Sequence, residues 1–387
     1  MMEQIQAYFS FTSYEIIGLS LFFLIFLIQV YLYVCHYMKP YRCAKKRNEE
    51  GSTLDAEKQP FVSIIVSSEN ESDNLSEHLP LLLEQDYPNF EVIVVNNGST
   101  DESDNQLNLL QQNYPNLYHT YLPGSSDRSF DKRKLSLTIG IKAAKGDVLL
   151  FTEPYCKPVS DKWIASMMEE LAEGKDIVLG YSYYSEYKGL VNRMARFDNL
   201  LFSLDYMSMA LRGCPFAGVY RNVAFKKKLF FENKGFASCL NLESGENVFL
   251  NMILNETNTA VALLPDSFVE TKLDTYNLWK QIKSSYSVAK SRFEKSYSRL
   301  YLDVSTRCMF YIAFILLMLH GIHAEQWGIV GISSLLFVVR SIIVELFVRK
   351  CASYFAAGPF LCFIPALDVL QPLYNLLFRT RPSKKRR

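Results

Sequence analysis

Basic side chains that precede a short apolar run are the first feature of this chain that could support chemistry. They surround apolar residues at helical spacing, and they are Lys132, Arg133, Lys134, Lys142 and Lys145. Gly146 is expected to end this helix with a positive φ, and residues 148–151, VLLF, indicate a buried parallel strand. Ligands bind at the carboxyl ends of such strands in open α/β sheets. The cations near that edge therefore predict an anionic ligand, most simply a diphosphate.

Strands alternate with helices on both sides of this segment. Strands are predicted at residues 61–66, 90–95, 117–121 and 176–180, and helices at 74–85, up to about 113, and from 163 to about 171. Strands and helices that alternate at this spacing are typical of a parallel, nucleotide-binding α/β half. We therefore expect an α/β fold in which the loops after the strands form the binding edge.

Residues 131–163 resemble the centre of a glycosyltransferase family 2 domain, in the version common in membrane-bound bacterial sugar-polymer enzymes. In that family the same helix, Gly-Asp pair and strand lead to a Thr-Asp-x-Asp-Cys turn, which holds a metal on a nucleotide-sugar diphosphate. The turn here is TEPYC, with Glu153 and Tyr155 at the two Asp positions. The resemblance implies a GT-A-like fold, a Rossmann-related mixed sheet flanked by helices.

Two earlier loops resemble the parts of the family that bind the donor. FVSIIVSSENE ends in Asn70 and Glu71, at the positions of an Asn-Glu pair that touches the nucleoside. VVNNGSTD resembles VVDDGSTD, in which an Asp recognises the nucleobase, and Asn96 and Asn97 replace the two carboxylates. Asparagine can still hydrogen-bond a base edge, although a plain loop with a helix cap is the alternative. The expected donor site is completed by Lys134, Glu153 and Tyr155.

The acceptor side resembles the family in two further segments. Residues 212–225 lead through two glycines to Arg221 and Asn222, which is similar to the family's Gly-rich strand and Arg-Asn-x-Ala. An irregular strand with ordinary turn glycines is the alternative. Residues 278–286 resemble a helix that grips the diphosphate and acceptor, with candidates Trp279, Gln281 and Lys283. An amphipathic helix on the membrane surface explains the same residues.

The general base is the least conventional position. SGENVFL resembles Gly-Glu-Asp-x-x-Leu, whose Asp takes the proton from the acceptor hydroxyl, but Asn247 stands at that position. An amide accepts no proton at neutral pH, so Asn247 is expected only to contact the acceptor or diphosphate. Glu246 is then the candidate catalytic base, or alternatively a carboxylate that a helix N-terminus favours.

A metal cofactor has two opposite expectations. Mg²⁺ and Mn²⁺ prefer hard oxygen ligands, and Glu153 offers one carboxylate, whereas Tyr155 offers only a phenol that is neutral near pH 7. Glu153, the diphosphate and water could hold the metal together. Alternatively, the cations around Lys134 and Lys142 neutralise the diphosphate without a metal.

Apolar residues at both ends predict membrane segments. Residues 16–34 are long enough to span, and the basic residues that follow place the middle of the chain in the cytoplasm, at the inner membrane. Residues 309–319 and 329–348 predict a helical hairpin, whose Arg340 should face a partner helix or polar cavity. Residues 354–378 contain three prolines, and we expect a re-entrant or interfacial segment before a cytoplasmic basic tail.

The predicted division has five parts: an N-terminal anchor (1–38), a charged linker (39–59), a cytoplasmic glycosyltransferase-like domain (60–300), a transmembrane hairpin (301–350) and a re-entrant segment with its tail (351–387). Lys and Arg number 41 against 40 Asp and Glu, which leaves no charge argument for nucleic acid. The eight cysteines form no CxxC and no metal-ligand spacing.

The leading hypothesis is a membrane-anchored, inverting glycosyltransferase, which moves a sugar from a nucleotide-sugar to a lipid-linked or polysaccharide acceptor at the cytoplasmic face. The alternative is a catalytically inactive pseudo-glycosyltransferase. It would act as a scaffold or regulatory subunit of a polysaccharide-assembly complex, beside an active glycosyltransferase partner.

Overall fold

The computed structural model describes residues 11–50, 59–122, 132–171, 174–242, 244–273, 275–293, 298–360 and 363–378. These residues divide into two compact units. One consists of those within Met1–Lys39 and Ser296–Leu377, and the other of those within Pro40–Lys295 and Phe378–Arg387. The larger unit holds all the candidate site residues.

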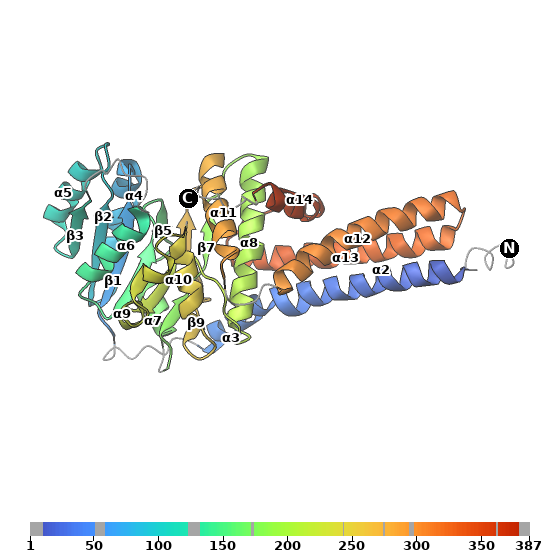
Figure 1. Ribbon diagram of the computed structural model, residues 1–387, viewed down its shortest axis with the longest axis horizontal. Coiled ribbons are helices and arrows are strands. Elements are labelled where there is room, and N and C mark those ends of the chain that lie inside the picture. Colours follow the sequence, from blue (N-terminus) through green and yellow to red (C-terminus); the bar gives the residue numbers. More distant parts are fainter. Residues whose placement is uncertain are drawn as a thin grey trace. The chain divides into compact units, whose positions relative to one another are not determined.

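The larger unit is built on a seven-stranded sheet with the order β3-β2-β1-β4-β8-β6-β9 (Figure 1). Its parallel half contains β1 (Val62–Ser68), β2 (Phe90–Asn96), β3 (Leu117–Tyr121) and β4 (Val148–Thr152). The short apolar runs of β1 and β4 are buried along their whole length, as expected for strands covered on both faces. This confirms the predicted α/β class.

The other half of the sheet is mixed. β8 (Val223–Lys226) lies antiparallel between β4 and β6 (Ile177–Leu179), and β9 (Thr259–Val261) pairs in parallel with β6. A separate three-stranded sheet follows the order β5-β10-β7, and its strands are β5 (Cys156–Pro158), β10 (Val269–Thr271) and β7 (Ser182–Tyr184). β5 begins directly after the TEPY turn, so this small sheet fixes the exit of the turn.

Helices cover both faces of the large sheet. They are α4 (Ser72–Leu83), α5 (Ser103–Asn113), α6 (Lys132–Ala143), α7 (Trp163–Glu169), α8 (Leu190–Ala210), α9 (Lys227–Glu232), α10 (Gly245–Ile253) and α11 (Tyr276–Lys290). Ile64 packs in one core with Leu75 and Trp163, whereas its neighbour Ile65 faces α6. A Cβ on Gly140 of α6 would lie only 2.8 Å from Ile65 Cγ2. The small residue therefore lets α6 approach β1 closely and places its first turn at the binding edge.

Two local predictions around glycine are wrong. α6 ends at Ala143 and Gly146 has no positive φ; instead, its N–H donates to Ser63 Oγ at 2.9 Å. A Cβ there would lie 2.6 Å from the Phe61 carbonyl oxygen, so close approach of two backbones requires the glycine. The glycines of residues 213–218 also lie outside any strand, because β8 begins only at Val223.

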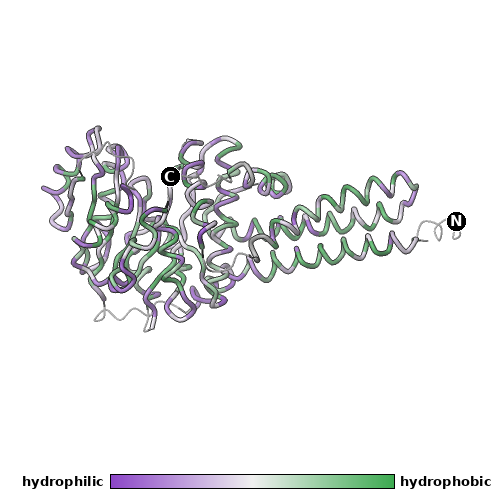
Figure 2. The backbone as a smooth tube through the Cα atoms, in the orientation of Figure 1, coloured by the Kyte–Doolittle hydropathy of each residue, from purple (hydrophilic) through white to green (hydrophobic). Residues whose placement is uncertain are grey.

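The smaller unit contains α2 (Ser13–Tyr31), the π-helix η1 (Leu32–Tyr37), α12 (Ser298–His323), α13 (Trp327–Tyr354) and α14 (Ile364–Leu377). Three stretches of the described chain are long and apolar enough to span a membrane, namely Ser13–Glu49, Leu302–His323 and Trp327–Tyr354. Figure 2 shows α2, α12 and α13 largely in the hydrophobic colour. The predicted anchor and hairpin are therefore helical.

A buried polar network joins α14 to the other helices of this unit. Arg340 Nη2 of α13 lies 2.8 Å from Asp368 Oδ2 of α14 and donates to Gln29 Oε1 of α2 at 2.8 Å. Arg307 Nη1 of α12 lies 3.3 Å from Asp368 Oδ1. The expectation that Arg340 faces partner helices is confirmed. Residues 364–377 form a separate helix of 14 residues, shorter than the roughly 20 residues of a membrane span.

The predicted charged linker differs from the structure in its first half. Lys39–Glu50 forms the helix α3, which suits its Lys, Arg and Glu residues and a proline in the first turn. Residues 51–58 of that linker and the predicted basic tail 379–387 lie outside the described residues.

Candidate active site

One guanidinium joins the two candidate carboxylates. Glu153 follows β4 directly and is buried. Arg133, in the first turn of α6, donates from Nη1 to Glu153 Oε2 at 3.1 Å and from Nη2 to Glu153 Oε1. Its Nε lies 3.3 Å from Oε1 of Glu246, which is also buried. The structure thus brings together the donor-turn carboxylate and the candidate base, 93 residues apart in sequence, around a residue that was not singled out.

Two helix N-termini converge on this cluster. Arg133 stands in the first turn of α6 and Glu246 in the first turn of α10. Ser244 begins α10 from a left-handed conformation, φ 55°, and the turn directs Glu246 toward Arg133. Because a helix N-terminus carries about half a positive charge, the two helix ends favour carboxylates and other anions here.

Tyr155 and Asn247 flank the cluster as neutral groups. Burial raises the pKa of Tyr155 well above its ordinary value, and the Glu153 carboxylate raises it further, so the phenol stays protonated. Asn247 Nδ2 lies 3.4 Å from Glu246 Oε1, the outer limit of a hydrogen bond. Neither residue adds a charge to the site.

The side chains around Glu153 do not fit a carboxylate-held metal. Both Glu153 oxygens accept hydrogen bonds from Arg133, and protonated Tyr155 is a poor ligand for Mg²⁺ or Mn²⁺. Within the described ranges, no group of three or more His, Cys, Asp and Glu residues could hold a metal ion. The expectation that Glu153 binds a metal therefore finds no support in this geometry.

The loops after β1 and β2 form one hydrogen-bonded edge beside the cluster. Asn70 is in a left-handed conformation, φ 55°, and accepts the Thr100 N–H at 2.8 Å through its side-chain oxygen. Asn97 Nδ2 donates to Ser67 Oγ at 2.9 Å, and Asn96 Oδ1 accepts from the Ser99 N–H at 3.0 Å. These are the loops in which the donor-binding asparagines were predicted.

Two polar atoms on this edge are buried without a hydrogen bond. Asn96 Nδ2 and Asn97 Oδ1 have no partner among the residues that the structure describes, and both side chains are almost entirely inaccessible. Buried polar atoms are usually paired, because leaving one unpaired costs about 1–3 kcal/mol. One free donor and one free acceptor, side by side, match the edge of a nucleobase. Glu71 lies nearby, where its Oε2 accepts from Asn74 Nδ2 at 2.5 Å.

The sequence profile of Glycosyl transferase family 2 matches residues 63–231, which include β1, β2, β4 and Glu153. The chain carries a family 2 glycosyltransferase domain. The glycosyltransferase AglE of Haloferax volcanii is 30% identical over 124 residues, which cover 31% of this chain and 39% of AglE. The chain therefore spans about two fifths of that relative's length.

A solved structure shares the fold of this glycosyltransferase domain and its helices. It is the mannosyltransferase PcManGT from Pyrobaculum calidifontis in complex with GDP-Man and Mn²⁺, with a TM-score of 0.54 and 15% sequence identity. The match covers 92% of this chain and 99% of PcManGT. The GT-A fold expected from the resemblance is thereby confirmed.

Several predicted site residues of the glycosyltransferase domain are placed in structural contacts instead. Lys134 Nζ donates to the carbonyl of Cys239 at 3.2 Å and to that of Leu242, so its charge holds the segment before α10. Asn222 accepts the Trp163 indole N–H at 3.1 Å and donates to two backbone carbonyls. Both side chains are fully buried, which explains their polarity by packing rather than by a ligand.

The predicted acceptor residues do not gather at the cluster either. Arg221 is buried and donates to Ser182 Oγ at 2.9 Å, with further bonds to Tyr184 and Asn199. Lys283 pairs with Asp198. The other two candidates lie on α11, where Trp279 is buried and Gln281 is exposed. The acceptor side therefore remains a prediction.

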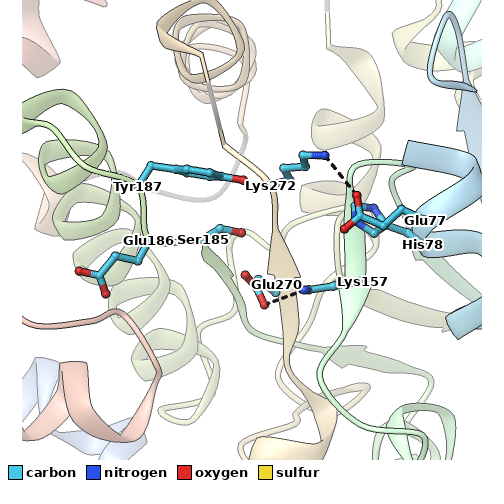
Figure 3. Close-up of a pocket in the computed structure, with 8 residues that line it drawn as sticks. All are labelled: Glu77, His78, Lys157, Ser185, Glu186, Tyr187, Glu270 and Lys272. Atoms are coloured by element: carbon cyan, nitrogen blue, oxygen red, sulfur yellow. Dashed lines mark hydrogen bonds and ion pairs between the residues drawn. The ribbon is translucent and has the colours of Figure 1, made fainter. Parts of the chain in front are cut away.

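A polar pocket of about 380 Å³ lies behind the TEPY turn. Its residues are Glu77, His78, Lys157, Ser185, Glu186, Tyr187, Glu270 and Lys272. Figure 3 shows Lys272 directed at Glu77 and Lys157 at Glu270, with N–O distances of 3.3 and 3.5 Å. His78 Nδ1 lies 2.9 Å from the Pro154 carbonyl oxygen. The pocket shares no residue with the cluster, and it supports the turn that carries Glu153.

Arg133 is the functional candidate that sequence reasoning missed. It was visible as one of five basic residues on the predicted helix. Nothing in their spacing distinguishes the arginine except its side chain, which can bind a carboxylate through two parallel N–H bonds where lysine cannot.

Proposed function

We propose that the protein is a membrane-anchored glycosyltransferase that moves a sugar from a nucleotide-sugar donor to a lipid-linked or polysaccharide acceptor, with inversion. One observation carries this proposal: Glu153 of the donor turn and Glu246, the candidate base, lie on opposite sides of the Arg133 guanidinium. A donor diphosphate beside Arg133 would therefore lie next to a carboxylate able to accept a proton.

The unpaired atoms of Asn96 and Asn97 support nucleotide binding at the same edge. A nucleobase that reaches them would satisfy a buried donor and a buried acceptor at once. PcManGT, which has the same fold, binds the nucleotide-sugar GDP-Man. Which nucleotide this chain prefers follows from the base edge that pairs with these two amides.

The proposed reaction is a single displacement. The acceptor hydroxyl oxygen attacks C1 of the donor sugar and forms the new glycosidic bond. The bond from C1 to the diphosphate oxygen breaks, and the nucleoside diphosphate leaves with its electron pair. Glu246 takes the hydroxyl proton, because the neighbouring Asn247 cannot. A positioned base of this kind contributes roughly 10²–10⁴-fold to the rate.

The membrane topology is part of the proposal. Helices α2, α12 and α13 would anchor the enzyme in the inner membrane. Basic residues within 39–47 follow the first span and favour the cytoplasmic side. The glycosyltransferase domain would then face the cytoplasm, where nucleotide-sugars and the inner leaflet's lipid-linked acceptors are both within reach.

A nucleotide titration followed by a transfer assay tests this function. The detergent-purified full chain is heated with UDP, GDP, CMP or dTDP, and a specific ligand should raise its melting temperature by mass action. Transfer of the matching sugar is then measured for the wild type and for Glu246→Gln. We expect the variant to lose roughly 10²–10⁴-fold in turnover, with its nucleotide shift retained.

Glu232→Gln is the matched control, because Glu232 is an exposed glutamate on α9 of the same domain. It should leave turnover unchanged. A Glu246→Gln variant that keeps turnover within tenfold of the wild type would remove Glu246 from the mechanism.

The second candidate is a non-catalytic subunit of a polysaccharide-assembly complex. The pairing of both carboxylates with Arg133 favours it, since an ion-paired carboxylate is a weaker base. A chain whose melting temperature responds to none of the four nucleotides would belong to this class.

A further inference from the structure

We infer that Arg133 takes the place of a divalent metal, so that its guanidinium binds the donor diphosphate directly. The inference rests on the proposed function, since it assumes a nucleotide-sugar at this edge. It assigns a diphosphate-binding group to a residue outside the motif positions and makes donor binding independent of metal.

The first argument is that the carboxylate ligands are already engaged. A metal at the TEPY turn would need Glu153, whose two oxygens both bind Arg133. The second motif position offers only the protonated phenol of Tyr155. A cation is nevertheless present between the carboxylates of Glu153 and Glu246, and it is the guanidinium.

The second argument concerns the hydrogen bonds that Arg133 has left. A guanidinium has five N–H donors in a planar fork. Its contacts with Glu153 and Glu246 use three of them, one each on Nη1, Nη2 and Nε. The two carboxylates therefore leave two N–H groups for another acceptor, and the Arg133 side chain is 34% exposed. Phosphate oxygens fit this fork well.

The third argument is the charge balance. Glu153, Glu246 and Arg133 sum to −1, and the N-termini of α6 and α10 add about half a positive charge each. The total is near zero. Two carboxylates with a bound divalent cation would have the same total, so the guanidinium and the helix ends reproduce the charge of a metal-loaded site. A further Mn²⁺ would gain little here.

The neighbouring lysines do not offer the same function. Lys134 is buried with its ammonium on two carbonyl oxygens. Lys132 pairs with Glu69 at 3.0 Å on the surface. Among the basic residues of α6, Arg133 alone contacts Glu153 and Glu246 in the described part of the chain.

The test is calorimetric binding of UDP and GDP to the detergent-purified full chain, in EDTA and in Mn²⁺. The wild type should bind one of them with an affinity that EDTA leaves within about twofold. Arg133→Ala should weaken binding in EDTA by about 10- to 100-fold, the loss expected for charge-assisted hydrogen bonds. Mn²⁺ should then restore part of the affinity, because Glu153 and Glu246 are released as ligands.

Two further variants keep the test decisive if Arg133→Ala folds poorly. Arg133→Lys retains the charge without the fork and should lose about tenfold in EDTA. Lys132→Ala, one residue away, should bind like the wild type. Melting temperatures without ligand show whether each variant is folded.

The outcomes separate this inference from the proposed function. Wild-type binding that appears only with Mn²⁺ overturns the inference and leaves the glycosyltransferase proposal standing. Arg133→Ala and Arg133→Lys variants that bind in EDTA as tightly as the wild type also overturn it. If the folded wild type binds neither nucleotide in either condition, nucleotide-sugar binding itself is contradicted, and the inference falls with it.

Discussion

Asp368→Asn should destabilise the helical unit by about 3–5 kcal/mol, the cost of removing one partner from a buried charge pair. Asp368 Oδ1 accepts from Tyr33 at 2.7 Å and lies 3.3 Å from Arg307; Oδ2 accepts from Tyr311 at 2.6 Å and lies 2.8 Å from Arg340. Whichever way the asparagine amide turns, its NH₂ group faces one tyrosine hydroxyl and one arginine. The substitution therefore loses a charge and places donors against donors.

The charge count explains why no neighbour compensates for this loss. Asp303, one turn before Arg307 on α12, pairs with that arginine. The wild-type network of two arginines and two aspartates is neutral, and the asparagine variant carries +1 in a site where every charged side chain is buried. An uncompensated buried charge of this kind dominates the expected cost.

The assay is equilibrium unfolding of the full chain in mixed detergent micelles, with Glu345→Gln as the control. Glu345 lies on α13 and pairs at 2.6 Å with Arg349, which is exposed. A surface pair contributes only about 0–1 kcal/mol. The two variants thus remove one carboxylate each, but only one of the two carboxylates is buried.

A double-mutant cycle identifies the charge as the cause. Arg340→Met combined with Asp368→Asn leaves Arg307 with Asp303, a neutral pair. The double variant should be more stable than the sum of the single effects predicts, with a coupling of about 0.5–3 kcal/mol. Additive effects, or an Asp368→Asn variant within 1 kcal/mol of the wild type, would refute the argument.

Three further predictions concern the glycosyltransferase domain. Burial, with the charge of Lys283, lowers the pKa of Lys290 from 10.5 to about 8; the folded protein therefore gains stability as pH rises between these values, and Lys290→Met should raise the melting temperature at pH 7 but progressively less toward pH 10.5. Asn222→Ala should cost about 3 kcal/mol or more, because an indole N–H and two carbonyls lose their partner, whereas the exposed Asn233→Ala should be nearly neutral in the same melt. Gly146→Ala should cost about 1–3 kcal/mol in chemical denaturation, because its Cβ would overlap a strand carbonyl; a variant as stable as the wild type would show that this backbone can move apart.

The parallel half of the sheet could be predicted because its signal is local. The runs that form β1, β2 and β4 are nearly continuous in apolar residues, and their predicted bounds differ from the observed ones by at most two residues. The strands of the small sheet have three residues each. A run that short has no periodicity of its own, so tertiary pairing alone defines it.

The cluster could be predicted only in part, because it depends on how helices are turned against the sheet. Glu153 and Glu246 follow from the resemblance, but the contact with Arg133 depends on α6 presenting its second residue, rather than its third, to the end of β4. Lys134 illustrates the same limit: one residue further along, its side chain reaches the carbonyls before α10 instead. Sequence spacing identifies the basic helix and leaves its rotation undetermined.

The network around Asp368 also sets an order of events during synthesis. Arg307 has an acidic partner, Asp303, within its own helix, so it is compensated as soon as α12 forms. Arg340 reaches the membrane before Asp368 has been translated, and until then its available partners are Gln29 and Tyr311. An isolated arginine in a bilayer is costly. In the proposed topology, α14 is thus the last element to be made and the one that completes the bundle, so a chain interrupted before residue 364 would present an unmatched charge to the machinery that inserts and inspects membrane proteins.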